Sequence, residues 1–169
     1  IRLSLVGSEM CIRDSYGGVR AFTATSGPGL SLMAESISMA AVAEIPVVII
    51  DVMRAGPSTG MATKVEQSDI RYAVGSGHGD AEKIVLAAAS IEDCYYIVQE
   101  AFNLAEEYQT PVIVLSDLQF GMCKQSVPAF DRDRIGIRRG KLVTEGLSEL
   151  DMKTKSYFHR FEDTEDGIS

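Results

Sequence analysis

Arg54 is the side chain of this sequence whose type and position most directly suggest chemistry. It lies in the segment DVMRAGPSTG, residues 51–60, directly after a run of apolar residues that is typical of a buried strand. A guanidinium at the end of such a strand can hold a carboxylate through two parallel hydrogen bonds. The alternative interpretation is a structural ion pair with a carboxylate nearby in the sequence, namely Asp51, Glu66 or Asp69.

A glycine-rich turn, TATSGPGL at residues 23–30, is the second candidate. It joins an apolar run to an amphipathic run, so it is predicted to be a strand–loop–helix junction, which presents unpaired backbone N–H groups to a ligand. Glycine lets another molecule approach the backbone closely, and Pro28 suits the first turn of a helix. The same pattern also fits a purely structural turn. The candidate binding residues in this turn are Thr25, Ser26, Gly27 and Gly29.

Three further polar side chains belong to glycine-rich loops. Ser58 and Thr59 offer hydroxyl groups in the loop that follows Arg54, where turn formation alone would also explain them. His78 lies between two glycines and close to Asp80, so it is a candidate proton shuttle; a surface histidine beside a carboxylate is the simpler alternative. The sequence has 2 histidines and 3 widely spaced cysteines, which give no metal-binding pattern.

The elements that must position these residues alternate between strands and helices. Apolar β-branched runs predict strands, and apolar residues at helical spacing predict helices. This alternation implies an α/β fold with a doubly wound, mainly parallel sheet, in which ligands bind beyond the carboxyl ends of the strands. That rule selects residues 25–29, 51–60 and 116–121. The predicted strands are Val19–Thr25, Val47–Val52, Lys83–Ala87 and Val112–Leu115, and the predicted helices are Leu30–Ala43, Ser68–Ala73 and a capped helix from Ser90 to about Tyr108.

Composition excludes some classes of partner. The chain has 169 residues, 46% of them hydrophobic, and a formal net charge of -8. An acidic chain disfavours nucleic acid and anionic membranes as partners. No apolar run approaches the roughly 20 residues that a membrane-spanning helix needs. Scattered cysteines are typical of a reducing compartment, so we expect a cytoplasmic protein.

The sequence divides into three parts. Residues 1–15 do not continue into the pattern that follows and resemble a translated adapter sequence, so we expect a non-native leader and leave it out of the fold prediction. Residues 16–125 are predicted to form one α/β domain that is incomplete at its N-terminus. Residues 126–169 carry many charges and no clear apolar period, which predicts an extended linker toward a missing C-terminal domain, with residues 138–141 exposed.

Several motifs together resemble a known family. The segments ATSGPG and AEIPVVII, residues 24–29 and 43–50, resemble the flavodoxin-like pyrimidine-binding domain of the thiamine-diphosphate enzymes. The later motifs narrow the resemblance to the alpha subunit of 2-oxoacid:ferredoxin oxidoreductases, and most closely to the 2-oxoglutarate type. Those motifs are DVMRAGPSTG (51–60), GHGD (77–80), AFNLAE (101–106), TPVIVLSD (110–117) and TEDGIS (164–169).

The resemblance implies oxidative decarboxylation of a 2-oxoacid with coenzyme A, which gives an acyl-coenzyme A, CO2 and reduced ferredoxin. Arg54 matches the family position that holds the substrate carboxylate, and residues 25–29 match the loop beside the cofactor and the substrate. Ser58, Thr59 and His78 match positions at the rim of the pocket. Thiamine diphosphate with Mg2+ would be shared with a beta subunit, and a [4Fe–4S] cluster would lie on that partner.

Two features of the family have no counterpart in this sequence. The activating glutamate precedes the TSGPG segment, in the part that residues 1–15 replace, so no catalytic residue is assigned. There is also no GDG loop and there are no cluster cysteines, so we expect the chain alone to be inactive and to bind thiamine diphosphate weakly. Two alternatives stay open: the pyrimidine domain of another thiamine-diphosphate enzyme, such as a synthase or decarboxylase, and a non-enzymatic flavodoxin-like binding module in which Arg54 forms a structural ion pair.

Overall fold

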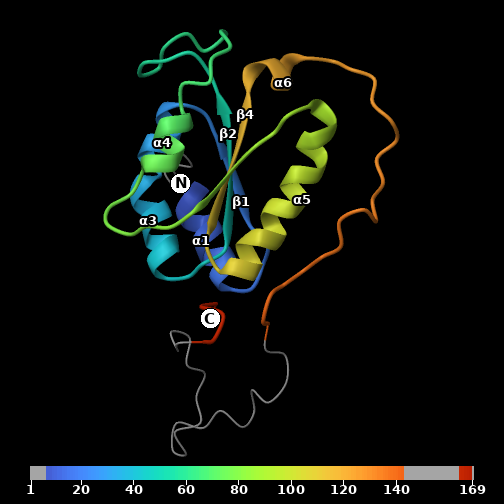
Figure 1. Cartoon of the computed structure of the whole chain (residues 1–169). Coiled ribbons are helices and arrows are strands. Elements are labelled where there is room, and N and C mark those ends of the chain that lie inside the picture. The colour runs from blue at the N-terminus through green and yellow to red at the C-terminus, as the bar shows by residue number, and fades with distance from the viewer. Residues whose placement is uncertain (1–6, 143–163, 169) are drawn as a thin grey trace, which may run out of the picture.

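A parallel sheet of 4 strands with helices on both faces forms the centre of the computed structural model, which describes residues 7–142 and 164–168 (Figure 1). The strand order is β1-β2-β4-β3, and every neighbouring pair is parallel, which confirms the predicted doubly wound α/β class. The strands are β1 (Phe22–Thr25), β2 (Val47–Met53), β3 (Ile84–Ala87) and β4 (Pro111–Asp117). The helices are α1 (Gly7–Tyr16), α2 (Pro28–Leu32), α3 (Ala34–Val42), α4 (Ile70–Gly75), α5 (Ile91–Tyr108) and α6 (Leu118–Met122).

Each face of the sheet has its own core, because successive side chains along a strand point to opposite faces. On β2, Ile49 and Met53 point into the layer that α1, α2, α3 and α4 form, whereas Val48 points toward α5. On β4, Ile113 points into the same layer as Ile49, and Val114 points toward α5. Both central strands are therefore buried on both faces, which explains their continuous apolar sequences.

Local sequence explains the longest helix and a break in the predicted first helix. The Ser90 hydroxyl accepts a hydrogen bond of 3.0 Å from the backbone N–H of Asp93, so Ser90 caps α5 as expected. The predicted helix Leu30–Ala43 is instead two helices, α2 and α3. The Met33 N–H bonds to the Leu30 carbonyl three residues back, a tighter turn that interrupts the regular helix.

Residues 7–15, which the fold prediction left out, take part in the folded domain. They belong to α1, which packs on β1 and α3 and contributes the buried Ile12 to the core of that layer. The Ser15 hydroxyl donates to the carbonyl of Pro46, just before β2. The contacts that hold α1 come from distant parts of the chain, which its own sequence does not reveal; its non-native origin stays a prediction.

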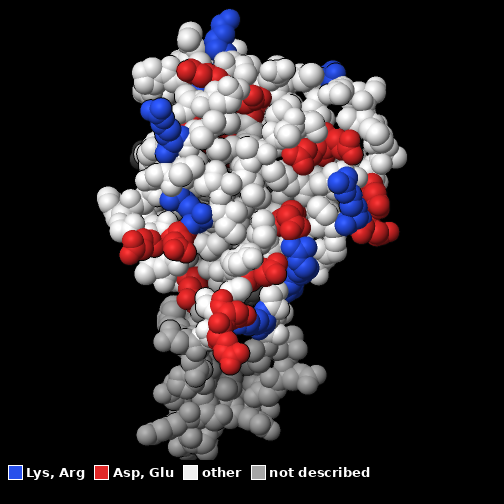
Figure 2. Space-filling model, viewed as in Figure 1, with Lys and Arg blue, Asp and Glu red and all other residues white. Residues whose placement is uncertain are grey.

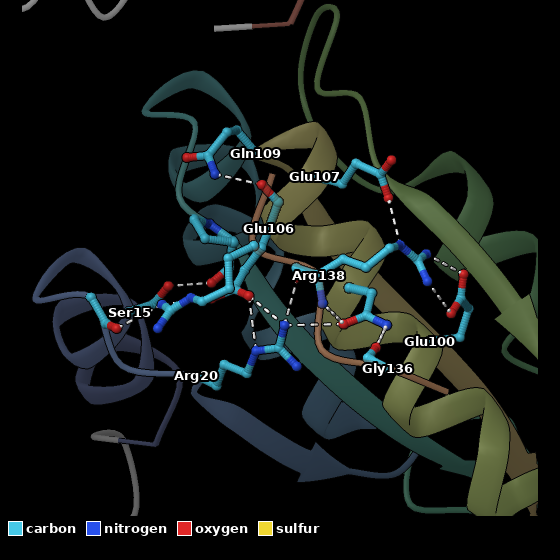
Figure 3. Close-up of polar contacts among 12 residues, drawn as sticks. Ser15, Arg20, Glu100, Glu106, Glu107, Gln109, Gly136 and Arg138 are labelled. Carbon is cyan, nitrogen blue, oxygen red and sulfur yellow. Dashed lines mark hydrogen bonds and ion pairs between the residues drawn. The ribbon is translucent and has the colours of Figure 1, made fainter. Parts of the chain in front are cut away.

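The segment after α6 lies along α5 as an extended chain, and residues 143–163 are outside the described part. Figure 3 shows Arg20 pointing toward Glu106, and Arg138 toward Glu100 and Glu107. Acidic and basic side chains alternate down the side of the molecule where α5 and this segment lie (Figure 2). Residues 138–141 are exposed as predicted, but Arg138 and Arg139 form ion pairs with α5, and Lys141 forms one with Asp166.

Within the described ranges, no helix combines the length and the apolar character that crossing a bilayer requires. The three cysteines, Cys11, Cys94 and Cys123, are free thiols.

Candidate functional site

The glycine-rich turn after β1 and the arginine after β2 meet at the carboxyl edge of the sheet, the upper edge in Figure 1. Gly27 has a φ of 51°, a left-handed conformation that favours glycine. An ideal β-carbon built on Gly27 would lie 3.5 Å from the Nε atom of Arg54 and 4.0 Å from an oxygen of Asp69. Both are ordinary van der Waals distances, so the side chains of Arg54 and Asp69 border the backbone of the turn at Gly27.

Arg54 makes no ion pair within 4.0 Å in the described part of the chain, and its Nε is buried without a hydrogen-bond partner. The structural ion pair with Asp51, Glu66 or Asp69 is therefore not formed. An unpaired, partly buried guanidinium is costly unless a ligand completes its hydrogen bonds, so Arg54 has the properties of an anion-binding group.

The loop of residues 54–69 is held over this edge by one hydrogen bond within the loop and one to the end of β4. The Ser68 hydroxyl donates to the carbonyl of Arg54 at 2.6 Å, and the Gln67 amide donates to the Asp117 carboxylate, at the end of β4, at 2.8 Å. A backbone bridge between Ala55 and Met61 closes the loop on itself. Residues 25–29, 51–60 and 116–121, which were predicted to lie at the carboxyl edge of the sheet, thus come together there.

An open depression of about 390 Å³ lies between this loop and the turn. Of the predicted site residues, Gly27, Arg54 and Ser58 line it. Thr25 sits beneath the turn, where a β-carbon on Gly29 would overlap its hydroxyl oxygen. Ser26 and Thr59 do not line this depression. Its other lining residues are Pro28, Ser31, Gly56, Pro57, Glu66, Ser68, Asp69 and Tyr72.

His78 lies away from the other candidates. It lines a separate depression with Glu44, Glu82 and Thr110, which lie at the amino ends of β2, β3 and β4. The structure therefore does not bring His78 together with Arg54, because the loop that carries it packs at the opposite edge of the sheet. A role as a proton shuttle beside Arg54 has no geometric support.

Asp51 is a buried acid that the sequence analysis named only as a partner for Arg54. It is 0% exposed, and neither of its carboxylate oxygens meets hydrogen-bond geometry with a donor among the described residues, although the Gly27 N–H lies near enough to lower the pKa of Asp51. Burial, and next the charge of Asp69, raise the pKa of Asp51 to about 7, because both disfavour its ionised form. The signal in the sequence was a single charged residue within an otherwise apolar strand, VVIIDVM.

Comparisons with known proteins show the family of this chain. A subunit alpha of 2-oxoacid:ferredoxin oxidoreductase 2 from Aeropyrum pernix is 49% identical over 90% of this chain and 23% of its own length. The 2-oxoglutarate synthase subunit KorA from Archaeoglobus fulgidus is 53% identical over 69% of this chain and 34% of its own length. This chain therefore spans about a quarter to a third of the length of these two relatives.

A solved structure with the same fold gives a TM-score of 0.89 at 39% identity and covers 100% of this chain and 28% of its own. It is a 2-oxoglutarate:ferredoxin oxidoreductase from Magnetococcus marinus with 2-oxoglutarate, coenzyme A and succinyl-CoA bound. The family model "Pyruvate flavodoxin/ferredoxin oxidoreductase, thiamine diP-bdg" matches residues 6–165. With nearly its whole length matched, the chain belongs to the thiamine-diphosphate-binding family of the pyruvate flavodoxin/ferredoxin oxidoreductases.

Proposed function

We propose that this chain is part of the alpha subunit of a 2-oxoacid:ferredoxin oxidoreductase and that Arg54 binds the carboxylate of the 2-oxoacid. The observation that carries the proposal is the unpaired guanidinium of Arg54 beside the Gly27 turn, at the edge of a depression with room for a small molecule. The relatives and the structural neighbour support the substrate class, and 2-oxoglutarate in particular, because their names include it.

The reaction would be oxidative decarboxylation with coenzyme A. The bond between the carboxylate and the keto carbon breaks to release CO2, the acyl group forms a thioester with coenzyme A, and the electron pair passes to ferredoxin. Bound thiamine diphosphate supplies the carbon centre that stabilises the negative charge left by the departing CO2. Arg54 would hold the carboxylate in a fixed orientation, which is the contribution this chain makes before that bond breaks.

The residues present fit the pyrimidine end of the cofactor. Gly27 carries no side chain that would close the turn off from the depression, and Thr25, Ser26 and Gly29 lie in the same turn at the end of β1. We therefore assign Ser26, Gly27 and Gly29 to the cofactor, Thr25 to the substrate, and Ser58 and Thr59 to the rim of the substrate site. The Mg2+ site, the [4Fe–4S] cluster and the contact with ferredoxin are assigned to a beta subunit, in a complex that works in the cytoplasm.

Replacing Arg54 in the complete complex tests the proposal. Arg54→Gln removes two charge-assisted hydrogen bonds of about 1.5 kcal/mol each, so the KM for the 2-oxoacid should rise about 100-fold while the KM for coenzyme A stays the same. Arg71→Gln is the matched control, because Arg71 is exposed on α4 and does not line the depression. An unchanged KM for the 2-oxoacid in an assembled Arg54→Gln complex would disprove the carboxylate assignment.

A further inference from the structure

Two acidic side chains lie under the Gly27 turn, and the proposed binding role of Arg54 does not account for them. Asp51 shares a face of β2 with Ile49 and Met53, so its carboxyl group points into the core between the sheet and α2, α3 and α4. Both of its oxygens, and Oδ2 of Asp69, are buried without hydrogen-bond partners in the described structure. Buried polar atoms of this kind require an explanation, because each costs free energy.

The two acids face each other beside the binding group. Asp69 immediately precedes α4 but its side chain does not cap that helix. Its Oδ2 lies 4.0 Å from the position of a β-carbon on Gly27, and Nε of Arg54 lies 3.5 Å from the same point. Arg54 and Asp69 thus both lie next to Gly27, which has no side chain. Two neighbouring carboxyl groups away from bulk water cannot both ionise at little cost, so Asp51, the more deeply buried of the two, retains its proton.

We propose that Asp51 and Asp69 are positioning residues that share one proton beneath Gly27 and set the negative charge that an anion bound at Arg54 experiences. This proposal rests on the proposed function of Arg54. With one proton, the pair carries a single negative charge, which balances the guanidinium. When the second carboxyl group ionises, an extra negative charge lies close to the bound anion and weakens its binding.

The other charged groups around the pair are already engaged or lie on its outer side. Asp117, on the same face at the end of β4, accepts hydrogen bonds from Gln67 and from the Phe120 N–H. Glu66, on the loop, accepts from the Gly56 N–H at 3.3 Å. The elements β1 and α2 carry no titratable side chain. Ionisation of the Asp51–Asp69 pair is therefore the charge change expected beneath the site near neutral pH, where Asp51 loses its proton at a pKa of about 7.

The test measures anion binding against pH in the complete complex. The KM for 2-oxoglutarate and the Ki of glutarate, which lacks the reacting keto group, are followed from about pH 6 to pH 8.5. In the wild-type complex both should rise about five- to tenfold as pH increases, since one additional unit charge acts at short range through a partly screened medium. Asp51→Asn keeps the shape of the side chain but cannot ionise. The KM for 2-oxoglutarate and the Ki of glutarate should therefore stay near the values that the wild-type complex shows at pH 6, and they should not depend on pH.

Controls separate this proposal from the function on which it rests. Glu35→Gln removes an exposed carboxylate from α3 and should leave the pH profile as in the wild type. If Asp51→Asn does not assemble, Asp69→Asn, which removes one of the two causes that raise the pKa of Asp51, should move the same rise to lower pH. A rise that persists unchanged in either assembled variant overturns the proposal, as does a flat wild-type profile. If Arg54→Gln leaves the KM at pH 6 unchanged, the proposed function itself fails, whatever the acidic variants show.

Discussion

Glu106 and Glu107, neighbours on α5, allow a matched test of how the extended segment is fixed to the domain. Glu106 has a side chain that is 8% exposed; it accepts a hydrogen bond from Nε of Arg20 at 2.8 Å and forms an ion pair with Nη2 of Arg139 at 2.7 Å, so it joins two arginines from distant parts of the chain. Glu107 is 39% exposed and contacts Arg138 at 3.3 Å. The two residues have the same chemistry and lie on the same helix, but their burial differs.

The expected magnitudes follow from that burial. Glu106→Ala removes one buried and one half-exposed charge-assisted contact and leaves Arg20 without its acidic partner, which should cost about 3 kcal/mol. Glu107→Ala removes one exposed ion pair and should cost about 0.5 kcal/mol or less. Because Arg139 loses its link to α5 only in the first variant, the segment around residues 132–142 should open much more often in Glu106→Ala.

Limited trypsin digestion of the full-length subunit measures this opening, since cleavage of a transiently open segment follows its equilibrium population. The sites after Arg132, Arg134 and Arg138 should be cut about 100-fold faster in Glu106→Ala than in the wild type, and within about threefold of the wild-type rate in Glu107→Ala. Equal cleavage rates in the two variants would refute the conclusion that the buried glutamate, rather than the sum of surface charges, fixes the segment.

Two further predictions concern the site. Gly29→Ala places a β-carbon on the hydroxyl oxygen of Thr25, so the melting temperature of the complex should fall by several degrees, whereas Gly75→Ala, with nothing within 4 Å, should leave it unchanged. Asp51 binds its proton more tightly when folded, with a pKa of about 7 against 3.8, so wild-type stability should decrease between about pH 4 and pH 7, by up to about 4 kcal/mol. Asp51→Asn should lack this decrease in urea unfolding measured at pH 5 and pH 8; lower stability of the variant at pH 8 would contradict the assignment of a buried, raised pKa.

The sheet could be predicted from the sequence because its signals are local. We could predict β2 and β4 from their apolar runs, and α5 from its N-cap and amphipathic pattern. None of these signals depends on the rest of the chain. The first strand was predicted too long, from Val19. It begins at Phe22 because the Val19 N–H bonds to the Asp14 carbonyl and Arg20 turns toward Glu106. The contact between Arg20 and Glu106 joins distant residues, so no local pattern reveals it.

The site shows the same division between local and distant signals. The rule that ligands bind at the carboxyl ends of parallel strands was enough to bring the Gly27 turn and Arg54 together. It could not show that Asp69 returns beneath the turn, because that depends on the course of the loop and on the hydrogen bond from Gln67 to Asp117. His78 was grouped with the site by resemblance, but its loop lies at the other edge of the sheet.

The charges around the depression also bear on what this chain can bind by itself. Of the described side chains that line it, Arg54 is the single cation, whereas Glu66 and Asp69 are acidic and Asp51 lies directly beneath. One guanidinium can compensate the single charge of a carboxylate, but a diphosphate brings at least two more negative charges into an already acidic surrounding. The depression therefore suits the carboxylate of a 2-oxoacid and the uncharged pyrimidine end of thiamine diphosphate. The diphosphate needs positive charge from outside this surface, and this requirement is the physical reason for assigning the Mg2+ site to the proposed partner subunit.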